Sequence, residues 1–95
     1  MPVTADIIIE IGSVLRDYCG GAPELTLLAA TVREALAQIE QQQPALYRSV
    51  CDETGAVRRH VGVFVNDTHI RDRDGLDTAL VPGDAITILP AVSGG

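Results

Sequence analysis

The residues with the clearest chemical potential stand at the carboxyl end of the sequence, which reads Gly94-Gly95. Two residues without side chains have almost no steric width, so an extended tail of this kind can enter a narrow enzyme channel and place its carboxylate against a nucleotide phosphate. Fixing such a tail costs about 1–2 kcal/mol per residue, so the folded part must dock as well. We therefore take Gly95 as the candidate attachment point and Gly94 as the residue that keeps the tail slim.

A second set of side chains, Cys51, His60 and Asp67, has the types of a nucleophile, a base and an orienting acid. No nucleophile elbow or other enzyme signature surrounds them, so we predict that the protein is not an enzyme. Cys19 lies 32 positions before Cys51 without a CxxC motif, and neither a zinc nor an iron–sulfur site is indicated. We interpret both cysteines as reduced thiols that act as small apolar residues, with a redox role for either left open.

Composition limits the size and the partners of the protein. Its 95 residues, 46% of them hydrophobic, suit one small domain with a modest core. Thirteen acidic against seven basic residues give a net charge of −6, which disfavours nucleic acid and membrane surfaces and favours a basic protein partner. All seven basic residues are arginine, so no lysine can accept an isopeptide bond. Neither a secretory signal nor a membrane span is recognisable, and we expect a cytoplasmic location.

Hydrophobic periodicity predicts the elements in chain order. Alternating apolar residues from Val3 to Ile11 predict a strand with one buried face, and Gly20-Gly21 leads to a second strand at 24–28 that returns beside it. Thr31 and Glu34 fit a capping box, in which each side chain accepts from the other's backbone N–H, and Pro44 ends the helix that begins there. The other expected elements are short helical turns at 13–18 and 46–50, strands at 61–65, 69–71 and 85–89, and a loop with one helical turn at 72–80.

Two turns complete the predicted topology. Asn66-Asp67 can adopt positive φ and reverse the chain, and Pro82-Gly83 fits the centre of a type II turn. With a hairpin first and a helix crossing next, the last long strand can pair with the first in parallel. We therefore predict an α+β fold with a mixed sheet of about four to five strands and one main helix across one face, the β-grasp arrangement of ubiquitin. The domain would span residues 1–90, and residues 91–95 would form a flexible tail.

The last third of the sequence carries a family resemblance. Its motifs are Val65-Asn66-Asp67, the turn Pro82-Gly83-Asp84 and the ending Ile86-Thr87-Ile88-Leu89-Pro90-Ala91-Val92-Ser93-Gly94-Gly95. In these the chain resembles the ThiS/MoaD family of ubiquitin-like sulfur carrier proteins, and within it the CysO type. The segments at 52–60 and 72–77 are longer than in a minimal ThiS, and this difference argues against the thiazole pathway.

The resemblance implies a carrier that other enzymes act on. In the family, a ubiquitin-activating-type adenylyltransferase and sulfurtransferase uses ATP and Mg to adenylate the terminal glycine, here Gly95, and a sulfur donor then leaves a thiocarboxylate. The chain itself would bind no cofactor and no metal. The implied partners that accept the sulfur are a cysteine-synthase-like enzyme or the large subunit of a pterin synthase, with a metallopeptidase as a further partner. Cysteine biosynthesis is favoured, and molybdopterin and thiazole biosynthesis stay open.

Two other functions remain open. A ubiquitin-like modifier would pass the same activated tail to lysines of other proteins, and a simple interaction module would not need the diglycine. For docking, Val63, Phe64 and Leu89 are candidates for an exposed apolar patch, although strand alternation favours burial of any single one of them. An acidic set is either a steering surface or a solvated loop, and it comprises Asp67, Asp72, Asp74, Asp77 and Asp84.

Overall fold

The computed structural model describes residues 5–90 of the chain. Residues 1–4 and 91–95 lie outside this range, and with them Gly94, Gly95 and the whole of the predicted tail. The predicted boundary after residue 90 therefore stays a prediction.

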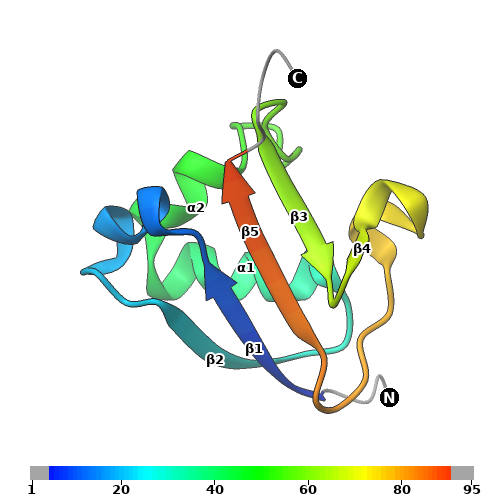
Figure 1. Ribbon diagram of the computed structural model, residues 1–95. Coiled ribbons are helices and arrows are strands. Elements are labelled where there is room, and N and C mark those ends of the chain that lie inside the picture. The colour runs from blue at the N-terminus through cyan, green and yellow to red at the C-terminus, as the bar shows by residue number, and fades with distance from the viewer. Residues whose placement is uncertain (1–4, 91–95) are drawn as a thin grey trace.

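Five strands form one mixed sheet in the order β2-β1-β5-β3-β4 (Figure 1). β1 (Ala5–Ile11) pairs antiparallel with β2 (Glu24–Ala29) and, on its other edge, parallel with β5 (Ala85–Pro90). β3 (Val61–Val65) pairs antiparallel with β5 and with the short β4 (Thr68–His69). The last strand is thus the central one, and the predicted hairpin and parallel pairing of first and last strands are confirmed.

Two helices, α1 (Val32–Gln42) and α2 (Pro44–Val50), cover one face of this sheet (Figure 1). Thr31 caps α1 as predicted, because its Oγ1 accepts a hydrogen bond from the Glu34 N–H at 3.2 Å. The Glu34 carboxylate, however, accepts from the Ala30 N–H at 3.4 Å, so the second half of the capping box is displaced by one residue. No helix within residues 5–90 is long and apolar enough to cross a membrane.

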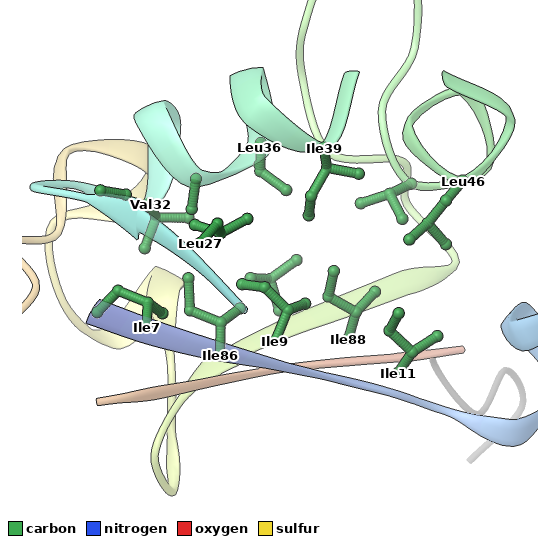
Figure 2. Packing of buried hydrophobic residues seen from close by; sticks show 14 of the residues in the cluster. Ile7, Ile9, Ile11, Leu27, Val32, Leu36, Ile39, Leu46, Ile86 and Ile88 are labelled. Atoms are coloured by element: carbon green, nitrogen blue, oxygen red, sulfur yellow. The ribbon is translucent and has the colours of Figure 1, made fainter. Parts of the chain in front are cut away.

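Alternation in the two central strands builds the core (Figure 2). Every second residue of β1 is buried, and the residues between them face away from the helices. A fully buried isoleucine stabilises a fold by about 1.5–3 kcal/mol relative to an exposed one, so the layer between sheet and helices is the main source of stability. Its largest side chains are Ile7, Ile9, Ile11, Ile39, Leu46, Ile86 and Ile88, all at most 1% exposed.

The β3–β4 connection differs from the prediction by about one residue. Asn66 has the expected positive φ of 55°, but the following strand is only Thr68–His69, and Ile70–Asp72 forms a 3₁₀ helix instead of strand. His69 ends the strand because its Nδ1 accepts a hydrogen bond from the Arg71 N–H at 3.1 Å, which caps the helical turn.

The remaining short elements agree with the sequence. Further 3₁₀ helices span Ser13–Cys19 and Gly75–Asp77, where helical turns were expected. Gly83 has a φ of 90°, and the Asp84 N–H donates to the Val81 carbonyl at 3.0 Å, which together make the predicted type II turn before β5.

Candidate functional site

The segment with the candidate chemistry joins the described fold at Pro90, the last residue of β5 (Figure 1). On one side Pro90 lies opposite Val61 in the β3–β5 register. On the other side the Gly12 N–H donates a hydrogen bond to the Ile88 carbonyl at 2.8 Å. β5 is therefore paired up to Pro90 on the β3 edge and up to Ile88 on the β1 edge, and Pro90, from which residues 91–95 follow, lies at the centre of the sheet.

Gly12 permits this close approach at the end of β5. A Cβ atom at Gly12 would lie 3.0 Å from Leu89 Cδ2, 3.2 Å from the Ile88 carbonyl oxygen and 3.3 Å from Pro90 Cδ. Its φ of −58° is open to any residue, so the requirement for glycine is one of space and not of backbone conformation. The sequence shows Gly12 only as the end of a strand, because its contact with Leu89 spans 77 positions.

The face of the sheet that the helices leave uncovered carries exposed apolar side chains. Leu89 is 40% exposed and lies nearest to Pro90, and Ile8 and Leu28 on β1 and β2 are 40% and 49% exposed. Val63 does not belong to this patch, because it is 0% exposed on the core side of β3, the burial that strand alternation favoured for any single candidate. Phe64 is half-buried, with its ring edge-on to His69 at 5.0 Å between ring centroids.

Two members of the acidic set have structural partners. Asp77 forms an ion pair with Arg33 at 3.2 Å, and the Asp84 carboxylate accepts hydrogen bonds from the Val81 N–H at 2.9 Å and the Asn66 side-chain amide at 3.1 Å. Asp84 thus joins the turn before β5 to the turn after β3. Asp67, Asp72 and Asp74 are exposed, and their role in steering stays a prediction.

The three candidate catalytic side chains do not meet. Cys51 is 1% exposed at the end of α2, beside a hollow of about 520 Å³ that Tyr47 and Arg58 also line. Burial raises the pKa of the Cys51 thiol, which keeps it protonated and a poor nucleophile. His60 precedes β3 and Asp67 follows it, so a five-residue strand of about 17 Å separates them.

The remaining reactive side chains, Cys19 and Asp52, make contacts within the fold. Cys19 is a buried free thiol whose Sγ lies 3.5 Å from the carbonyl oxygens of Arg16 and Ala22. Within residues 5–90, no group of three or more His, Cys, Asp or Glu side chains could hold a metal ion. Asp52 closes the loop before β3, and hydrogen bonds from the Thr54 hydroxyl and from the Thr54 and Ala56 N–H groups hold its pKa below the ordinary value.

Comparison with known proteins identifies the family to which this fold and its carboxyl-terminal segment belong. The model of the ThiS family matches residues 17–95, a range that includes Gly94 and Gly95. The chain belongs to the ThiS family. This ThiS-family protein is 32% identical over 92 residues to the sulfur carrier protein CysO of Mycobacterium tuberculosis, covering 95% of this chain and 99% of that protein.

Two further similarities bear on function. The chain is 36% identical over 66 residues to the small archaeal modifier protein 3 of Haloferax volcanii, covering 70% of this chain and 71% of that protein. It also superposes on a chain in the crystal structure of the Amycolatopsis orientalis BexX/CysO complex with a TM-score of 0.83, 32% identity and coverage of 94% and 99% of the two chains.

These similarities confirm the predicted β-grasp, ubiquitin-like fold and the resemblance to the CysO type. The ThiS-family relatives are small carriers and modifiers, not catalysts. The chain is accordingly a ThiS-type sulfur carrier or a ubiquitin-like modifier, and it is not an enzyme.

Proposed function

We propose that this protein carries sulfur as a thiocarboxylate on Gly95. A partner adenylyltransferase transfers the AMP group of ATP to the Gly95 carboxylate, which forms an acyl-adenylate and releases pyrophosphate. A sulfide equivalent then attacks the acyl carbon and AMP leaves with the bonding electron pair, so that one carboxyl oxygen is replaced by sulfur. ATP and Mg are used by the partner, and this chain supplies the acyl group.

The observation that carries the proposal is the family match that runs through Gly94 and Gly95, together with 32% identity to a named sulfur carrier along 95% of the chain. The fold agrees with it, because the tail attaches to the central strand and the described body has no assembled catalytic group. A carboxylate is a weak acyl electrophile, so a carrier of this kind depends on an activating partner. The complex of a CysO with BexX shows that a related carrier assembles with another protein.

Intact-mass measurement tests the proposal. The protein is incubated with the adenylyltransferase encoded in the same genome, ATP, Mg and sulfide, and the expected result is a mass gain equal to the exchange of one oxygen for one sulfur. A variant that lacks Gly95 serves as the control and should gain nothing. The proposal is contradicted if the full chain and the variant without Gly95 gain the same mass. It is also contradicted if the full chain gains no mass with an enzyme preparation that is shown to adenylate a carrier protein.

Protein modification is the second candidate, and the similarity to a small archaeal modifier protein favours it. It shares the adenylation step and differs in the acceptor, which is a lysine amine of another protein. The chain has no lysine, so it cannot build chains on itself. Conjugates of higher mass that only an isopeptidase cleaves would identify this function.

The most specific part of the proposal is the identity of the sulfur acceptor. The name of the CysO relatives favours cysteine biosynthesis, with a cysteine-synthase-like acceptor and a metallopeptidase that trims the product from Gly95. The alternatives are a pterin synthase large subunit and a thiazole-forming enzyme. Offering the purified thiocarboxylate to each acceptor in turn and measuring its consumption decides among them.

A further inference from the structure

The reach of the tail limits where an activating enzyme can touch the body. Five residues, 91–95, extend at most about 17 Å beyond Pro90. The enzyme surface around its own active site therefore meets the carrier near the end of β5. Two hollows lie at this end, one on the uncovered sheet face and one on the side of the helices.

The hollow on the sheet face has a volume of about 310 Å³ and is lined in part by Glu10, Glu24, Thr87 and Leu89. Glu10 and Glu24 lie directly opposite each other in the β1–β2 register, and both are exposed. Like charges in this position destabilise a sheet. The hollow thus holds two carboxylates that repel each other next to an exposed leucine.

Among the described residues, these two carboxylates have one hydrogen-bond donor and no ion-pair partner. The Thr87 hydroxyl donates one hydrogen bond to Glu10 Oε2 at 3.2 Å. Arg16 also lines the hollow, but its Nε donates to the Ile11 carbonyl at 2.9 Å, and it forms no ion pair with either glutamate. A cation placed between the two glutamates would relieve their repulsion.

We infer that this hollow receives a basic side chain, arginine or lysine, of the enzyme that activates the tail, while an apolar part of that enzyme packs on Leu89. The inference rests on the proposed function and adds the surface that recognises the enzyme. A second copy of this chain is disfavoured as the occupant, because each copy carries a net charge of −6. Anionic surfaces are disfavoured for the same reason.

The glutamate pair should then affect stability and binding in opposite directions. Replacing one carboxylate by an amide removes the repulsion, so Glu10→Gln or Glu24→Gln raises the melting temperature by about 1–5 °C. The same change weakens the enzyme complex about two- to fivefold per glutamate, with kcat for adenylation unchanged. A purely structural role would move both quantities in the same direction.

Calorimetric titration of the carrier with the adenylyltransferase, at low and at moderate salt, tests this inference. Glu40→Gln is the matched control, since it removes the same charge by the same substitution from an exposed residue of α1 outside this hollow. Tyr18→Ser probes the second hollow, which Tyr18 lines with Arg58, His60 and Pro90. We expect both glutamate variants to bind more weakly and with less salt dependence than either of these two.

Glutamate variants that bind like the wild type overturn the inference, and weakening confined to Tyr18→Ser would in addition place the contact at the second hollow. Binding and chemistry are measured separately, so the failures are distinguishable. A complex that forms and depends on Glu10 and Glu24 but yields no acyl-adenylate supports the docking surface and contradicts the proposed function. Absence of any complex with the wild type contradicts the docking surface.

Discussion

Filling the space at Gly12 should loosen the point from which the tail leaves the body. In Gly12→Ala the new methyl group would lie 3.2 Å from the Ile88 carbonyl oxygen, the same atom that accepts the Gly12 N–H at 2.8 Å. The Leu89 side chain can turn away, but the backbone oxygen can move only by lengthening that hydrogen bond. The variant therefore tests whether the close contact of β1 and β5 holds the end of the central strand.

The expected cost follows from three contributions. Overpacking costs about 1–3 kcal/mol, and weakening one hydrogen bond about 0.5–1.5 kcal/mol. The reduced freedom of the unfolded chain returns about 0.4–1 kcal/mol. The net loss is about 0.5–4 kcal/mol in the free energy of unfolding, which for a domain of this size lowers the melting temperature by roughly 2–30 °C.

Thermal melting combined with amide hydrogen exchange is the assay. The Gly12 amide and the amides of β3 that pair with the end of β5 should exchange faster, while those at the start of β1 change little. Gly75→Ala is the control, because Gly75 has a φ of 61° and no atom within 4 Å of a new Cβ, so its cost comes from the backbone alone. A Gly12→Ala variant with wild-type melting and exchange would refute the steric reasoning.

Three other changes have defined outcomes. Gly94→Val should leave the melting temperature unchanged and block ATP–pyrophosphate exchange by the adenylyltransferase, whereas unaltered exchange would contradict the narrow-channel argument. The raised pKa of Cys51 means that the thiol ionises at a lower pH in the unfolded chain, near pH 8.5, than in the fold. In denaturant titrations from pH 7 upward, its contribution to stability should be constant to about that pH and then fall by at most about 1.4 kcal/mol per pH unit, and the fall should be smaller in Cys51→Ala. The lowered pKa of Asp52 stabilises the fold above the unfolded pKa near 4, so melting from pH 5 to pH 2 should show this contribution lost as pH falls through the folded pKa, and Asp52→Asn should lack that part of the pH dependence.

The fold was predictable where the sequence shows contrast between neighbouring positions. β1 alternates apolar and polar residues, so its buried face could be read directly, and Pro82-Gly83 has the residue types of the type II turn that forms, with Gly83 at a φ of 90°. β3 is a run of apolar residues without such contrast. Which of its residues face the core is set by pairing with β5, which buries Val63 and turns Phe64 outward. The sequence alone could not decide between the two faces.

For the site, the sequence offers a signal only in its covalent part, and the role of that part stays a prediction. Gly94 and Gly95 stand out as residue types, and the family match includes them. The surface around the tail depends on registers between distant segments: Glu10 faces Glu24, and Gly12 contacts Leu89. Neither pairing has a local signal, because each follows from how hairpin and crossover lengths align the strands.

The number of residues after Pro90 also bears on the order of events in sulfur transfer. A stable protein interface covers about 800 Å² on each partner, a patch roughly 30 Å across. With a reach of about 17 Å from Pro90, the activating and the accepting enzyme both need surface near the end of β5, and the single Gly95 can lie in only one active site at a time. On the proposed function, the carrier leaves the first enzyme before the second one binds. On the inferred docking surface, a small hollow with two carboxylates and one leucine, we expect moderate affinity, which serves turnover better than a tight complex would.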